Sequence, residues 1–225
     1  MRPRDYDAIR HLSLTIYPEL PPWTEEYLAQ HHAVFPDGQL VAVTRASGAV
    51  VGYAASLVVQ WDDYDIDASW REMTADGRFT NHDPAGRTLY GAEVMVAPDA
   101  RRTGVGSAIY DARRALARRL RLRRIRAGAR LRGYHRYADR MSPEAYVEAV
   151  VRGDLTDPTL TFQLRQRFRV LAVVEDYLHH DPASLGHAAI IEWLNHAVAR
   201  LRDYAGRSDR FAKPRRRPGP RPHGK

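Results

Sequence analysis

Apolar residues recur along the chain at two spacings, one typical of helices and one typical of strands. Ile9, Leu12 and Ile16 lie at the helical spacing, and a second helical pattern follows Thr24, a residue suited to cap it. Another begins at Ser142, which precedes a proline suited to the first helical turn. The predicted helical segments cover residues 6–20, 21–35, 105–120, 142–153 and 157–167.

Runs of β-branched and aromatic residues predict strands between these helices. Segment 39–61 has two such runs around the turn RASGA, in which Gly48 can adopt a positive φ. A polar insertion with room for a short helix, 61–87, separates this hairpin from the next strand. The further predicted strands are 88–96, 123–131, 168–178 and 186–196. This order predicts an α/β fold of the α+β type, with a mixed, mostly antiparallel sheet flanked by helices, and excludes a doubly wound sheet.

Length and composition fit one globular domain, which we place at residues 1–210. Of the 225 residues, 44% are hydrophobic, which is enough for a packed core. The chain has no cysteine, so disulfides, thiolate metal sites and a cysteine nucleophile are all excluded. No window approaches the roughly 18 apolar residues of a membrane span, and the N-terminal segment is charged, so we expect a cytoplasmic protein without a membrane partner.

The net charge of +8 raises the question of nucleic acid, but its distribution argues against it. Much of the charge lies in two segments, 113–132 and the C-terminal tail 211–225. The tail is rich in proline and arginine, so we expect it to be disordered. A nucleic-acid partner would depend on this tail, and the rest of the chain does not favour one.

A glycine turn joins the predicted strand 88–96 to the helix that follows it. The turn has the pattern Arg101-x-x-Gly104-x-Gly106. Amides in the first turn of a helix lack intrahelical acceptors, and glycines allow an anion to approach them closely. The spacing is that of neither the dinucleotide fingerprint nor the P-loop. The turn therefore predicts a phosphate site of another kind.

This turn resembles the acyl-CoA signature of the GNAT family of N-acetyltransferases, Gln/Arg-x-x-Gly-x-Gly/Ala after a strand. The resemblance extends over about residues 35–195 and agrees with the predicted element order. It implies that acetyl-CoA, or another acyl-CoA, is a substrate, that no metal is needed, and that Met95 and Val96 pair with the pantetheine arm. It also implies that Arg101 or Arg102 adds charge and that the pyrophosphate binds the amides of Arg102, Thr103, Gly104, Val105, Gly106 and Ser107.

A narrower resemblance covers the segment from Gly133 to Leu171 and the segment from Asp176 to Trp193. These resemble the acetyltransferase module that precedes a carbon-nitrogen hydrolase in some bacterial proteins. Here no hydrolase follows in the sequence. The resemblance implies an N-acyltransferase that moves an acyl group to a primary amine by direct attack. The alternative is a non-catalytic acyl-CoA-binding module that serves a separate partner such as a hydrolase.

Candidate catalytic residues lie on the central strand and after the strand 123–131. Glu93 is the candidate base, and strand alternation places it on the same face as Met95. Tyr134 and His135 are candidate acid and base. Many members of the family have a tyrosine on a late helix as the general acid, but Gln163 stands at that position here, so the acid is in doubt.

Several charged and polar groups are interpreted as structural. The pairs His31–His32 and His179–His180 lack partners at a metal spacing, so we expect them on the surface. Arg113 belongs to an arginine-rich helix face that we expect to be solvated, and a contact between one of its arginines and the 3′-phosphate of CoA is left open. The acceptor stays open between a small molecule, a peptide and a protein, and a homodimer is left open.

Overall fold

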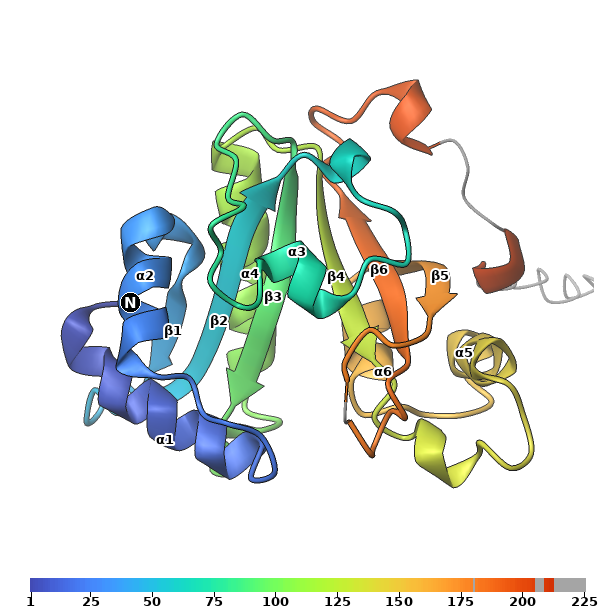
Figure 1. The fold of residues 1–225 in the computed structure, drawn as a ribbon, viewed down its shortest axis with the longest axis horizontal. Coiled ribbons are helices and arrows are strands. Elements are labelled where there is room, and N and C mark those ends of the chain that lie inside the picture. The colour runs from blue at the N-terminus through green and yellow to red at the C-terminus, as the bar shows by residue number, and fades with distance from the viewer. Residues whose placement is uncertain (180, 205–208, 213–225) are drawn as a thin grey trace, which may run out of the picture.

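The sheet has six strands in the order β1-β2-β3-β4-β6-β5 (Figure 1). The computed structural model describes residues 1–179, 181–204 and 209–212. The strands are β1 (Leu40–Val43), β2 (Val50–Val59), β3 (Thr88–Val96), β4 (Arg124–Arg130), β5 (Arg169–Val174) and β6 (Ala188–Leu194). Only β3 and β4 pair in parallel; the other four pairings are antiparallel. The predicted mixed, mostly antiparallel sheet is confirmed.

Helices cover both faces of this sheet and form two apolar clusters with it. The helices are α1 (Tyr6–Ile16), α2 (Glu25–Val34), α3 (Trp70–Thr74), α4 (Val105–Arg119), α5 (Pro143–Arg152) and α6 (Leu160–Arg165). Buried residues of α1, α2 and α3 pack in one cluster, whereas those of α4, α5 and α6 pack in the other (Figure 1). Within the described residues, no helix has the length and hydropathy needed to cross a bilayer.

Local signals in the sequence explain where several elements begin and turn. The hydroxyl of Thr24 accepts from the amide of Tyr27 and caps α2, and that of Ser142 accepts from the amide of Ala145 and caps α5. Gly48 has a φ of +70° in the turn between β1 and β2, as the sequence predicts. These caps and this turn are among the features that follow from local chemistry alone.

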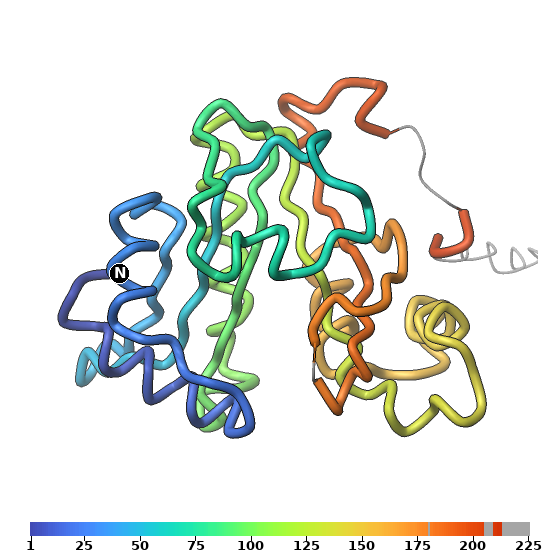
Figure 2. Tube along the Cα trace, in the orientation of Figure 1, coloured from blue at the N-terminus to red at the C-terminus, as the bar shows by residue number. Residues whose placement is uncertain are grey.

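The two central strands separate after three paired residues. Thr88, Leu89 and Tyr90 pair with residues 124–126, and no residue beyond Tyr90 has a partner on β4. Figure 2 shows β3 and β4 diverging from this point, which we call the fork. β3 also has a bulge, because Ala55 of β2 faces Glu93 while Ser56 faces Gly91. The fork leaves one edge of β3 open in the middle of the sheet.

Two expectations about surface residues are wrong. His31 is fully buried: its ring stacks on Phe79 at 3.8 Å, and its Nε2 lies 2.6 Å from the carbonyl oxygen of Gly77. Arg113 is 1% exposed and points into the sheet instead of into solvent. Both side chains hydrogen-bond with residues that are distant in sequence. Local sequence patterns cannot reveal such partners.

The C-terminal boundary differs from the predicted one in part. Phe211, which we assigned to the tail, is buried in the same cluster as α5. Residues 213–225, the rest of the predicted tail, lie outside the described residues. The packed part of the chain therefore extends at least to Phe211.

Candidate functional site

The glycine turn lies between the end of β3 and the start of α4. Gly104 is the N-cap of α4 and has a φ of +94°, and a Cβ built there would meet no atom within 4 Å. Glycine is needed at this position for backbone conformation and not for packing. At Gly106, by contrast, a Cβ would lie 2.9 Å from Cζ of Phe162, so this glycine lets α6 pack against α4.

The first turn of α4 has the character of an anion site. No side chain of the described chain caps it, because the Thr103 hydroxyl donates to Ala100 O at 2.7 Å and Ser107 Oγ accepts from Gln166 Nε2 at 3.0 Å. The helix is 15 residues long, so its dipole adds to the partial charge of these free amides. Arg101 and Arg102 are exposed beside the turn. Amides, dipole and guanidinium groups are a donor set that suits a phosphate.

The open edge of β3 leads from this turn towards the fork. Met95 and Val96 pair with β2 through Tyr53 and Gly52, and neither has a partner on β4. Met95 is buried in the cluster of α1 and α2, whereas Val94 packs against the other cluster. On the side that faces β4, the main chain of Met95 and Val96 therefore has no strand partner among the described residues.

Glu93 lies at the bulge, on the face of β3 that α1 covers. Its Oε1 accepts from the Tyr17 hydroxyl and from the Val94 amide, each at 2.9 Å. Burial raises the pKa of the Glu93 carboxyl, while hydrogen bonds from Tyr17, Val94 and Trp23 act in the opposite direction. As predicted, Glu93 and Met95 share this face.

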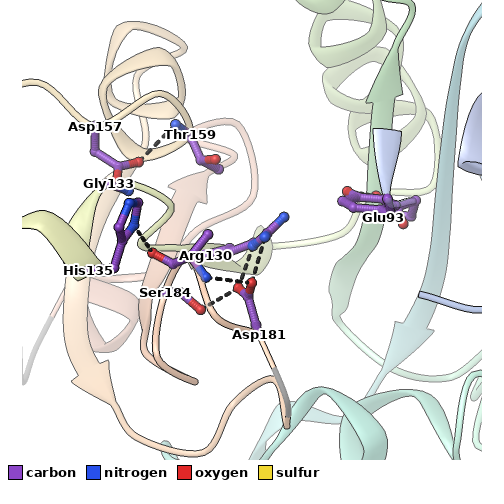
Figure 3. A network of polar contacts seen from close by, with 10 residues as sticks. Glu93, Arg130, Gly133, His135, Asp157, Thr159, Asp181 and Ser184 are labelled. Atoms are coloured by element: carbon purple, nitrogen blue, oxygen red, sulfur yellow. Dashed lines mark hydrogen bonds and ion pairs between the residues drawn. The ribbon is translucent and has the colours of Figure 1, made fainter. Parts of the chain in front are cut away.

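The opposite side of the opening carries a partly buried ion pair. Arg130 of β4 forms two hydrogen bonds with Asp181, which also accepts from the Ser184 hydroxyl. Figure 3 shows the guanidinium of Arg130 extending from β4 towards Glu93. Its Cζ lies 5.7 Å from the ring centre of Tyr17. Tyr17 thus bridges the two sides, with its hydroxyl on Glu93 and its ring beside Arg130.

The side chains of Tyr134 and His135 do not contact Glu93. Tyr134 is 4% exposed in the cluster of α5, and its hydroxyl donates to Met141 O at 3.1 Å. His135 is exposed, and its Nδ1 lies 2.9 Å from the carbonyl oxygen of Ala183. In Figure 3 the side chain of Arg130 lies between His135 and Glu93. These three candidates therefore do not form one constellation.

A pair of buried tyrosines at the fork was not predicted. Tyr90 and Tyr177 share a hydrogen bond between their hydroxyl groups, and the amide of Gly128 donates to Tyr177 Oη at 3.1 Å. Tyr177 follows β5, 87 positions after Tyr90. In the sequence, Tyr177 was visible only as part of an apolar run. Its contact with Tyr90 depends on the order of the strands in the sheet, which the run does not show. Gln163 is buried and donates from Nε2 to the Tyr110 hydroxyl at 2.9 Å.

A cavity of about 360 Å³ lies between η5 (Tyr134–Arg136) and α6. Its lining includes Arg136, Tyr137, Phe162 and Arg165. Phe162 is the residue that contacts Gly106, so the cavity adjoins the start of α4. Within the described chain, neither arginine forms an ion pair, and no group of three His, Asp or Glu side chains is placed to hold a metal.

Comparisons with known proteins agree with this geometry. The model of the acetyltransferase (GNAT) family matches residues 6–138. The probable hydrolase YhcX of Bacillus subtilis (strain 168) is 41% identical over 192 residues, which are 85% of this chain and 37% of that protein. The uncharacterized N-acetyltransferase YkwB of the same organism is 36% identical over 173 residues, 77% of this chain and 75% of that protein.

Two solved structures share the fold at low sequence identity. The GphF GNAT-like decarboxylase, in complex with isobutyryl-CoA, has a TM-score of 0.71 and 23% identity over 86% of this chain and 96% of that one. The loading GNATL domain of CurA from Lyngbya majuscula has a TM-score of 0.73 and 15% identity over 86% of this chain and 94% of that one. The chain spans little more than a third of the length of YhcX, as the narrower resemblance implies.

Proposed function

Because the chain belongs to the acetyltransferase (GNAT) family, we propose that it is an N-acyltransferase that moves an acetyl or longer acyl group from acyl-CoA to a primary amine. One observation carries this proposal. The open edge of β3 joins an anion site at the start of α4 to a carboxylate at the fork. One strand thus connects a phosphate-binding end to a proton-accepting end.

The binding half of the proposal uses main-chain groups. The amides of residues 102–107 hold the pyrophosphate, and Arg101 adds a charge-assisted contact. Met95 and Val96 hydrogen-bond the pantetheine arm along the unpaired edge of β3, as an added strand would. Arg136 and Arg165 bind the 3′-phosphate in the cavity beside Gly106. The thioester supplies an acyl carbon that is activated towards nucleophiles.

The chemical half depends on Glu93. Its carboxylate takes a proton from the attacking amine, directly or through a water, while both substrates are bound. The raised pKa makes this carboxylate a stronger base than an exposed one. Tyr17 holds Oε1 in place at 2.9 Å. With no cysteine in the chain to accept the acyl group, direct attack by the amine is the simplest route.

The acceptor is a small molecule, a peptide or a protein that offers a primary amine. A cytoplasmic location belongs to the same proposal. A second candidate is a non-catalytic acyl-CoA-binding module that serves a separate partner such as a carbon-nitrogen hydrolase. It is favoured by one observation, the amide of Gln163 at the position of the family's acidic tyrosine.

Two measurements on the full chain separate these candidates. Calorimetry with acetyl-CoA tests the shared binding claim, and its failure would overturn both. Thiol release is then followed against a panel of small amines, peptides and proteins. The enzyme releases CoA thiol in an amine-dependent manner, whereas the binding module binds acetyl-CoA and releases none.

A further inference from the structure

Tyr177 occupies the closed end of the opening between β3 and β4. Its Oη accepts from the amide of Gly128, two residues beyond Arg126, the last residue of β4 that pairs with β3. A Cβ on Gly128 would lie 2.0 Å from Cζ of Tyr177, so the phenol ring lies directly against the backbone of β4. The hydroxyl stands where the strand pairing stops.

The hydroxyls of Tyr17, Tyr90 and Tyr177 form hydrogen bonds around the fork, and two of their three protons are used in these bonds. Tyr17 donates to Glu93. The bond between Tyr90 and Tyr177 uses the proton of one of the two hydroxyls, so the pair keeps one proton for a further acceptor. Gly128 also donates to Tyr177. We assign Tyr90 as the donor in this bond, because Gly128 already donates to Tyr177 Oη, and this leaves the proton of Tyr177 available.

The surroundings of Tyr177 suit a group that gives up a proton and regains it. Burial raises the pKa of Tyr177 to about 12, the Glu93 charge adds to this, and the two hydrogen bonds act in the opposite direction. The hydroxyl is thus protonated at neutral pH. When the proton leaves, the phenolate keeps two donors, the Gly128 amide and the Tyr90 hydroxyl.

We propose that Tyr177 is the catalytic acid that protonates the departing sulfur, in the role that the family gives to a tyrosine at the position of Gln163. This inference rests on the proposed function. A carboxamide has no proton of suitable acidity, and that of Gln163 is bonded to Tyr110. Tyr177 reaches the fork from the β5–β6 loop and not from α6.

Two side chains take up and release the protons of this step. As the nitrogen–carbon bond forms, Glu93 takes one proton from the amine. As the carbon–sulfur bond breaks, Tyr177 gives its proton to the sulfur, which leaves as a thiol. Proton transfer from Glu93 to the Tyr177 phenolate then restores both groups.

The test measures the pKa of the thiol of bound CoA. This measurement needs no amine acceptor. We would titrate the thiol of CoA bound to the wild-type protein, to Y177F and to Y134F, following thiolate absorbance. A hydrogen bond from Tyr177 stabilises the thiolate, so Y177F should raise the pKa of the bound thiol by about one unit or more. Y134F removes the hydroxyl bonded to Met141 and should leave the pKa unchanged.

Each result decides the question. The same thiol pKa in wild type and Y177F would overturn the role of Tyr177, and a shift in Y134F alone would assign it to Tyr134. Absence of CoA binding to the folded wild type would instead overturn the proposed function. With an active amine, Y177F should also lower kcat by about 100-fold while the Kd for acetyl-CoA stays within about threefold.

Discussion

The guanidinium of Arg113 donates to the main-chain oxygen of Glu93 at 2.5 Å, from the opposite side of the sheet to Tyr17. The same group donates to Ala55 O at 2.7 Å and to Ser56 Oγ at 3.1 Å. A Cβ on Gly91 would lie 3.1 Å from its Nη1, so the glycine makes room for it. Arg113 thereby holds the bulge that positions the candidate base.

Replacing Arg113 with methionine should destabilise the fold. The change keeps an apolar stem but leaves buried carbonyl oxygens without a donor, which costs about 2–4 kcal/mol in the free energy of unfolding. Urea denaturation measures this loss. Arg119, an exposed residue of the same helix paired with Asp37 at 3.0 Å, gives the matched control R119M, for which we expect little change. Equal stability of the two variants would mean that Arg113 does not hold the bulge.

Glu93→Gln should lower turnover while acetyl-CoA affinity stays close to wild type. The amide still accepts from Tyr17 but takes up no proton, so kcat should fall by about 100-fold or more. Because the pKa of Glu93 is raised, wild-type activity should be lost as the pH falls through that raised value, and this limb should be absent in the variant. A variant with wild-type turnover across the pH range would exclude Glu93 as the base.

The elements of the fold could be predicted because their signals are local. The strand 88–96 has the bounds predicted for it, and α5 begins at its serine cap. The glycine turn was also found where the sequence places it. Arg113, His31 and Tyr177 were missed because their environments are made by residues 20 to 87 positions away. Amphipathic spacing assigns a face to a side chain, but it cannot show that a buried arginine or histidine has a partner there.

Gly104→Val should weaken acetyl-CoA binding without unfolding the protein. The side chain would enter open space in the free protein but would stand in the approach to the α4 amides, and the positive φ adds a backbone cost of about 1–2 kcal/mol. Calorimetry should show affinity reduced by 100-fold or more. Gly48 also has a positive φ and open space around it, so G48V carries the same backbone cost at a distant turn. If G48V weakened binding as much, general strain would explain the effect.

The free energy of unfolding should fall in acid because the buried ring of His31 resists protonation. Burial lowers the pKa of His31 to about 4 from an ordinary value of 6.5, so the folded protein keeps this ring neutral. The unfolded chain binds a proton below pH 6.5, and stability present above that pH is lost as the pH falls towards 4, by about 3 kcal/mol. Urea midpoints measured over this range should fall less steeply in H31Q. Parallel curves for the two proteins would show that His31 titrates normally when folded.

Arg165→Ala should weaken CoA binding only when the ligand carries its 3′-phosphate. Arg165 and Arg136 line the cavity beside Gly106 without an ion pair in the described chain, so a phosphate there would gain a charge-assisted contact. We expect a loss of about five- to tenfold for CoA and none for 3′-dephospho-CoA. Arg140, which pairs with Asp139 at the surface, gives the control R140A, for which both ligands should bind as to wild type. An equal loss for both ligands in R165A would mean that Arg165 contacts a part of CoA other than the 3′-phosphate, and no loss for either would mean that the cavity is not part of the CoA site.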